Sequence, residues 1–193
     1  MRTNLIRTGI VTTAALAAML APATSLAGSQ DSHTVTGGKV VLKLDPDTAE
    51  GFADMSIGIQ TTGRGKDGKN GLSWPISGGA GEIRPGPRGS TLSYGGLAFF
   101  TEGGPGTKFS KFGIRFGSNK TQLYAKAENS GGRFLNLDMD NAQVAQTDTS
   151  LKVKNAPATL TKAGAKVLSN TFDFPFKKGL SMGTVTVKAT LAG

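Results

Sequence analysis

Apolar and polar residues alternate in short runs along most of the chain after residue 40. The runs IGIQT (57–61), LNLDMD (135–140) and GTVTVKATL (183–191) each carry apolar side chains at every second position. A period of two places these side chains on one face of a β-strand, and Gly, Pro, Asn and Asp separate the runs as turn residues do. The pattern predicts an all-β domain, either an antiparallel β-sandwich or a barrel-like domain.

Two segments depart from this alternation and predict one or two short helices. Residues 45–48 (DPDT) open one or two helical turns through Asp54, with proline and acidic residues near the start, as helix N-termini prefer. Thr161 is the expected N-cap of a helix over residues 162–172. In that second helix, Ala165, Leu168 and Phe172 share one face at three- and four-residue spacing.

The turn signals divide the rest of the chain into strands. Gly78-Gly79 is expected to turn a hairpin, Gly95-Gly96 to form a bulge or a bend, and residues 117–120 to turn a second hairpin. Residues 63–71 are expected to form a loop. The expected strands cover residues 40–44, 55–61, 72–77, 80–84, 90–94, 97–101, 108–116, 121–127 and 133–140, one or two within 143–153, and 183–191.

The first 27 residues follow a different pattern. Arg2 and Arg7 precede an apolar stretch over residues 10–21, and Ser25 and Ala27 place small side chains at positions −3 and −1 before Gly28. This is the layout of a secretory signal peptide that is cleaved after Ala27. The apolar stretch is shorter than the roughly 20 residues that a membrane span needs.

We therefore expect a secreted protein, extracellular or associated with the cell wall. Its mature chain would have a flexible N-terminus over residues 28–38, a single domain over residues 39–193 and no transmembrane segment. The chain has no cysteine, so export brings no disulfide bonds.

Charge and composition narrow the classes of partner. Lysine and arginine number 22 against 13 acidic residues, which gives a formal net charge of +9. Such a surface favours anionic partners, and export favours an anionic polymer or a protein of the cell envelope over nucleic acid. The residues expected to form this binding surface are Arg64, Lys66, Lys69, Lys108, Lys111 and Arg115.

The sequence contains few residues that could catalyse a reaction or bind a metal or haem. His33 is the only histidine and lies in the expected flexible N-terminus, which disfavours a nucleophilic triad or a zinc site of His and Cys. Asp138 and Asp140 would share a strand face with carboxylates about 6 to 7 Å apart, a spacing that suits Ca²⁺ or paired-acid hydrolysis. The same pair also fits an ordinary solvated face. Tyr94 and Tyr124 are either haem ligands through the phenolate oxygen or ordinary strand aromatics.

From Leu72 to the end, the chain resembles the haem-transport-associated (HtaA) domain family. The similar segments are LSWPISGGAGEI, TLSYGGLAFF, FSKFGIRF, FLNLDMDNA, ATLTKAGAKVLSNTF and FKKGLSMGTVTV. The resemblance implies a β-rich binding domain, with haem as the ligand of characterised members. The family's first segment, which holds a tryptophan and a haem-coordinating tyrosine, has no clear match in residues 37–71. No histidine stands near residues 101–103, where the family carries one.

Three functions from different classes follow from these observations. The first is a secreted, non-catalytic binding or structural protein of the cell envelope or extracellular space, which needs no cofactor. The second is a haem-binding module of a haem uptake system. The third is a secreted hydrolase that uses Asp138 and Asp140. We expect no enzymatic activity, because no motif of the chain assembles a convincing set of catalytic groups.

Overall fold

Twelve strands and two helices make up the part of the chain that the computed structural model describes, residues 32–82, 88–117, 121–127 and 130–192. This confirms the predicted all-β class with two short helices. The elements, in chain order, are β1 (Ser32–Lys43), α1 (Pro46–Asp54), β2 (Ile57–Thr62), β3 (Lys66–Gly68), β4 (Gly71–Glu82), β5 (Arg88–Ser93), β6 (Gly96–Thr101), β7 (Gly106–Phe116), β8 (Thr121–Ala127), β9 (Ser130–Leu137), β10 (Gln143–Thr147), β11 (Ser150–Leu160), α2 (Lys162–Phe172) and β12 (Ser181–Ala192).

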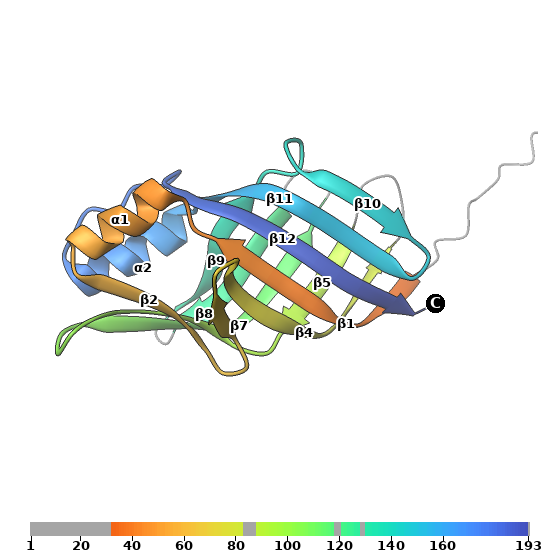
Figure 1. Ribbon diagram of the computed structural model, residues 1–193, viewed down its shortest axis with the longest axis horizontal. Coiled ribbons are helices and arrows are strands. Elements are labelled where there is room, and N and C mark those ends of the chain that lie inside the picture. Colours follow the sequence, from red (N-terminus) through yellow and green to blue (C-terminus); the bar gives the residue numbers. More distant parts are fainter. Residues whose placement is uncertain (1–31, 83–87, 118–120, 128–129, 193) are drawn as a thin grey trace, which may run out of the picture.

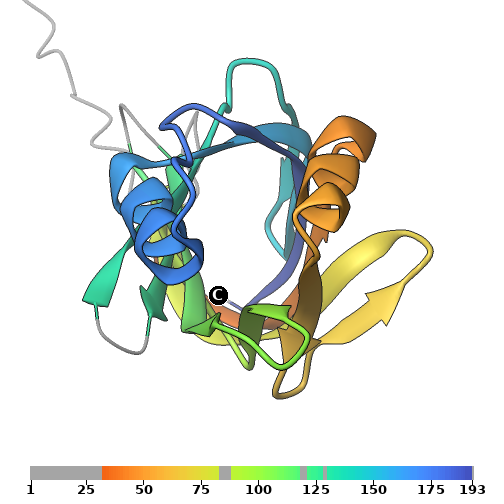
Figure 2. The ribbon, with the colours of Figure 1, turned by 90° about the vertical axis from the view of Figure 1, so that its left-hand side faces the viewer.

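Eight antiparallel strands close into a barrel, which decides between the two predicted architectures. Their order is β7-β5-β4-β1-β12-β11-β9-β8, and β8 pairs back with β7. Figure 2 shows this ring from the end at which α1 and α2 lie. The remaining strands extend the barrel: β6 and β2 continue from β7, β3 pairs with β4, and β10 pairs with β11. Closure gives each of the eight barrel strands a partner on both sides, and the pairing of β9 with β11 is the shortest, over Leu135–Leu137 of β9.

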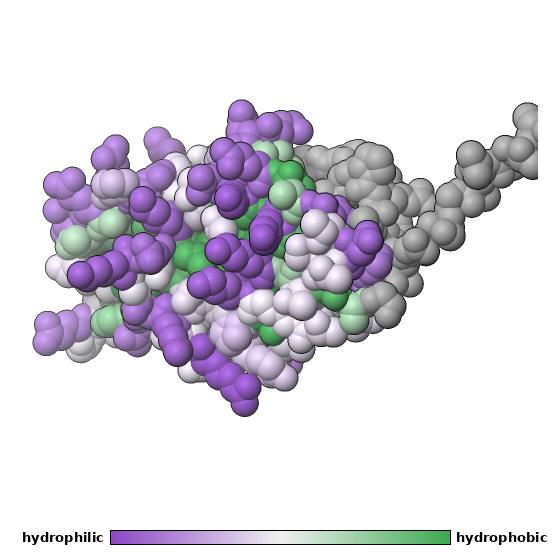
Figure 3. Space-filling view, turned by 45° about the vertical axis from the view of Figure 1, so that its right-hand side comes forward, coloured by the Kyte–Doolittle hydropathy of each residue, from purple (hydrophilic) through white to green (hydrophobic). Residues whose placement is uncertain are grey.

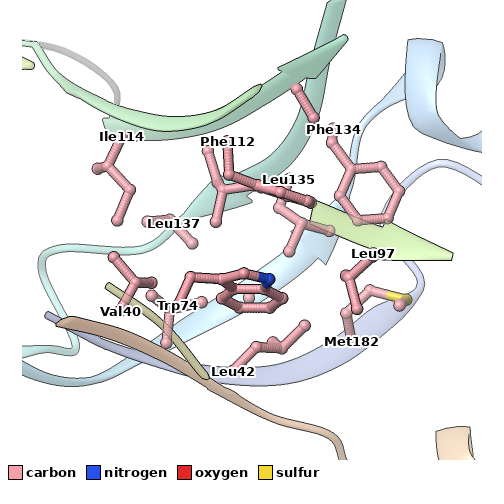
Figure 4. Close-up of a cluster of buried hydrophobic side chains, with 14 of the residues drawn as sticks. Val40, Leu42, Trp74, Leu97, Phe112, Ile114, Phe134, Leu135, Leu137 and Met182 are labelled. Carbon is pink, nitrogen blue, oxygen red and sulfur yellow. The ribbon is translucent and has the colours of Figure 1, made fainter. Parts of the chain in front are cut away.

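The interior of the barrel is filled by apolar side chains (Figure 4). Trp74 of β4 is 1% exposed and stacks on Phe112 of β7, with ring centroids 5.1 Å apart. Its indole nitrogen donates a 2.8 Å hydrogen bond to the carbonyl of Gly96, so the polar end of this large side chain is satisfied. A filled interior means that ligands have to bind at the outside or the ends of this barrel.

The two helices lie at one end of the barrel, on opposite sides of the ring (Figures 1 and 2). Phe52 of α1 is buried between the rings of Phe99 and Phe176, and Leu168 of α2 is fully buried. The Thr161 hydroxyl accepts a 3.0 Å hydrogen bond from the Gly164 amide, which confirms the predicted N-cap. Neither described helix is long and apolar enough to cross a membrane.

β7 changes its partner halfway along its length. Its first half pairs with β6 and its second half with β5, and β5 and β6 run in the same direction on either side of a bend at Tyr94-Gly95. Lys111 lies at the matching irregularity on β7, with a left-handed φ of 54°. The predicted bulge or bend at Gly95-Gly96 is therefore present, and it lets one long hairpin contribute to the barrel and to its extension.

Several predicted boundaries are wrong. Gly78-Gly79 turns no hairpin, because β4 continues through both residues while pairing with β1 and β5. A Cβ at Gly79 would collide with the carbonyl oxygen of Ser90, so this glycine permits close strand approach instead. Residues 32–38, expected as a flexible terminus, belong to β1, and the expected loop over residues 63–71 contains β3.

Candidate functional site

The outer face of the wall formed by β5, β7, β8 and β9 carries the most distinctive group of side chains. Strand pairing arranges them as two parallel rows across the four strands. One row is Ser90, Arg115, Gln122 and Asn136, and the other is Leu92, Gly113, Tyr124 and Arg133. Because residues paired across strands point to the same face, these eight positions form one continuous surface outside the barrel.

Tyr124 lies flat on this surface. A Cβ built on Gly113 would stand 2.5 Å from both Cζ and Oη of Tyr124, so the phenol ring extends from β8 over the backbone of β7. The side chain is half-buried, and its hydroxyl has no hydrogen-bond partner among the described residues. The glycine at position 113 is thus what allows the ring to take this orientation.

A groove of about 520 Å³ opens beside the phenol. This volume lies within the range of small-molecule and cofactor sites, roughly 300–1,000 Å³. The groove is lined by Gly89, Ser90, Arg115, Phe116, Gln122, Tyr124 and Arg133. Gly89, which has no side chain, and the short Ser90 on β5 leave the space that the longer side chains of β7, β8 and β9 surround.

Two arginines give the groove its charge. Arg115 and Arg133 are exposed, and neither forms an ion pair or a side-chain hydrogen bond with a described residue. Gln122 is held in place because its amide donates a 2.8 Å hydrogen bond to Asn136. Guanidinium groups bind carboxylates in a planar, bidentate geometry. The groove therefore suits a ligand that carries carboxylate groups for the arginines and a metal ion or hydrogen-bonding group for the Tyr124 oxygen.

A β-bulge directs Arg133 to the groove. Tyr124 pairs with Arg133 while Leu123 pairs with Leu135, which leaves Phe134 as the additional residue of β9. Phe134 and Leu135 are both buried, and Arg133 is exposed. Strict alternation would have placed Arg133 inside with Leu135, so the sequence pattern alone gives no sign that this residue faces outward. Gln122 and Asn136 are likewise not recognisable as site residues from sequence, because only the pairing of β8 with β9 brings them together.

The other predicted tyrosine lies elsewhere. Tyr94 is 51% exposed at the bend between β5 and β6, and the Arg64 guanidinium covers its ring at 4.8 Å from the centroid. It does not line the groove beside Tyr124. The structure thus separates two residues that the sequence treated as equivalent candidates.

The carboxylates of Asp138 and Asp140 do not share a strand face, because β9 ends at Leu137 and both residues lie in the following turn. Asp138 Oδ2 accepts a 2.7 Å hydrogen bond from the Asn141 amide, and Oδ1 accepts from the Asp140 backbone at 3.0 Å. The Asn141 side chain is the main reason that the pKa of Asp138 lies below its usual value. A general acid would need a raised pKa instead. Within the described ranges, no three His, Cys, Asp or Glu side chains gather to hold a metal.

The basic residues predicted as one surface fall into two groups. Arg64, Lys66 and Lys69 belong to β3 and its flanking loops. The other three, Lys108, Lys111 and Arg115, are exposed along β7. Only Arg115 of these six residues lines the groove.

Comparison with known proteins gives a family match. The sequence model of the HtaA family matches residues 47–188, more than half of the chain. Curated protein sequences yield no relative.

Solved structures share the fold at low sequence identity. The C-terminal domain of HtaA from Corynebacterium glutamicum aligns with a TM-score of 0.64 at 18% identity, over 83% of this chain and 99% of that one. The N-terminal domain of the same protein aligns at 0.60 and 11% identity, over 82% and 99%. The heme binding protein HtaB from the same organism aligns at 0.51 and 10% identity, over 83% and 95%.

Proposed function

Because the chain belongs to the HtaA family, we propose that it is a haem-binding module of a haem uptake system. A protein described as heme-binding, HtaB, shares the fold. The family match supports this alternative better than the general prediction of a secreted, non-catalytic binding or structural protein of the cell envelope or extracellular space. The proposal is one of binding, and it includes no catalytic step.

The groove beside Tyr124 is the proposed haem site. The unpartnered phenol of Tyr124 stands in a groove of about 520 Å³ between Arg115 and Arg133, neither of which is paired with a described residue. Tyrosine is an established protein ligand of haem iron, through its phenolate oxygen. Arginines bind the carboxylates of propionate side chains. The residues present therefore fit the ligand, with Tyr124 at the iron and the two arginines at the propionates.

Tyr124 is a better candidate than Tyr94 for a physical reason. A porphyrin needs a groove that removes its apolar surface from water as well as an oxygen ligand. Tyr94 is half exposed, and one face of its ring is already covered by Arg64. We therefore assign the iron ligand to Tyr124 alone.

We also propose that the protein acts outside the cytoplasm, at the cell envelope. The first 27 residues, with two arginines, an apolar stretch and small residues before Gly28, support this location. The formal net charge of +9 also favours an anionic polymer of the envelope as a partner.

A haemin titration followed by absorbance tests the proposed function. We expect a saturable Soret shift near one equivalent that Tyr124→Phe abolishes and Tyr94→Phe leaves intact. Arg115→Gln combined with Arg133→Gln should weaken binding, whereas Lys162→Gln with Lys166→Gln, an equal charge change on exposed residues of α2, should not. Loss of the shift in Tyr94→Phe with retention in Tyr124→Phe would contradict the assigned site. No shift in the unmodified protein would contradict haem binding itself.

A further inference from the structure

Three lysines stand side by side on a wall of the barrel that the haem groove does not use. Lys39 of β1 pairs directly with Lys188 of β12, and Lys188 pairs directly with Lys152 of β11. Figure 1 shows these three strands lying next to one another at the front of the barrel. We call Lys39, Lys188 and Lys152 the lysine row.

All three side chains point outward. They are exposed, while their chain neighbours Val40, Val187 and Val153 are at most 2% exposed and face the barrel interior. Cross-strand neighbours on one face have Cβ atoms about 4.5 to 5.5 Å apart. The lysine row is therefore a line of three positive charges about 10 Å long that runs across the strands.

The lysine row is expected to lower the stability of the fold. Like charges directly opposite one another destabilise a sheet. None of the three lysines forms an ion pair or a side-chain hydrogen bond with a described residue, and β1, β11 and β12 contain no acidic residue. A local arrangement that costs stability without compensation is the kind of feature that a binding function explains.

The surroundings of the row add further donors. Thr186 and Thr190 flank Lys188 on the outer face of β12, and Lys154 follows Lys152 on β11. The Thr186 hydroxyl oxygen accepts from the Asn155 amide at 3.3 Å, which leaves its hydrogen free to donate. In Figure 3, hydrophilic side chains project from much of the surface, and the hydrophobic residues between them form only small patches. The face is thus open, polar and positively charged.

We propose that the lysine row is a binding site for an acidic polysaccharide. A line of point charges on an open wall matches an extended polymer with repeated anionic groups, and lysine contacts such groups as a compact charge without the bidentate geometry of arginine. The threonine hydroxyls provide donors for sugar hydroxyl or carboxylate oxygens. The predicted export places the protein where such polymers occur. This site lies on β1, β11 and β12, so it is independent of the proposed haem groove on β5, β7, β8 and β9.

The test measures binding of the purified protein to polygalacturonate, with neutral dextran and duplex DNA as comparison polymers. We expect polygalacturonate to bind and dextran not to. Each lysine-to-glutamine change in the row should weaken binding about two- to fivefold at low salt, and all three together roughly 10- to 100-fold. The matched control is Lys162→Gln, Lys166→Gln and Lys178→Gln, which removes the same charge from exposed residues at the helical end.

Further measurements separate this site from general charge effects. Lys188→Gln should raise the stability of the fold at low salt, because it removes the central repulsion, while it weakens polymer binding. Haemin binding should be unchanged in all variants of the lysine row. The test can therefore refute polysaccharide binding at the row without affecting the proposal of haem binding at the groove. An equal loss in the control, binding no stronger than to dextran, or binding of DNA through the row with affinity equal to or above that for polygalacturonate would overturn the proposal.

Discussion

Gly113→Ala is a sharp test of how the groove is built. The added Cβ would stand 2.5 Å from Cζ and Oη of Tyr124 and 2.7 Å from the carbonyl oxygen of Thr91. The ring can swing away from the sheet, but the Thr91 oxygen belongs to the backbone of β5, the strand paired with β7. Overpacking of this kind costs about 1 to 3 kcal/mol. For a domain of this size, that corresponds to a decrease in melting temperature of about 2 to 12 °C.

The same substitution should also weaken haemin binding. Displacing the phenol is comparable to the loss of a group that orients a metal ligand, which lowers metal affinity about 10- to 100-fold. The assays are chemical unfolding followed by circular dichroism and a haemin titration. In the double variant Gly113→Ala with Tyr124→Ala, the cost to stability should be smaller than the sum of the two single changes, because the contact with the ring is gone.

Gly132→Ala is the matched control. It adds the same methyl group to β9, which is separated from β7 by β8, and there the nearest atom among the described residues, the Cβ of Ala163, lies at an ordinary 3.5 Å. The reasoning is refuted if Gly113→Ala is as stable as Gly132→Ala and binds haemin with unchanged affinity. A loss of stability with intact haemin binding would refute only the assignment of the groove.

Two further predictions concern stability. Thr161→Ala removes the N-cap of α2 and the hydroxyl that donates to the Arg133 carbonyl. Chemical unfolding should show a loss of about 0.5 to 2 kcal/mol in the free energy of unfolding. Thr161→Ser keeps the hydroxyl and should retain most of the stability. The pKa of Asp138 lies below its ordinary value, chiefly because the Asn141 side-chain amide donates a hydrogen bond to its carboxylate. The ionised form therefore stabilises the fold above the ordinary pKa of an aspartate, and this contribution is lost as the pH falls through the lower pKa of the folded state. The difference in unfolding free energy between the unmodified protein and Asp138→Ala should therefore shrink with acidification, and a constant difference would contradict this account.

The fold class could be predicted from sequence because it rests on local patterns. The alternation in residues 183–191 and the polar Thr161 before an amphipathic segment each determine an element without reference to distant residues. The error at Gly78-Gly79 has the same origin. A glycine pair that permits close approach of two strands looks, in sequence, like a pair that turns a hairpin, and only the partners on both sides of β4 distinguish the two.

The sequence by itself determined that the chain is β-rich and basic, that it has no cysteine and a single histidine, and which two tyrosines are available. Only the tertiary structure decided that Tyr124 joins Arg115 and Arg133, since a bulge at Phe134 turns Arg133 outward. It also decided that Lys39, Lys152 and Lys188, widely separated along the chain, form one row. The physical reason is that strand register is set by nonlocal pairing, and a shift of one residue moves a side chain to the opposite face.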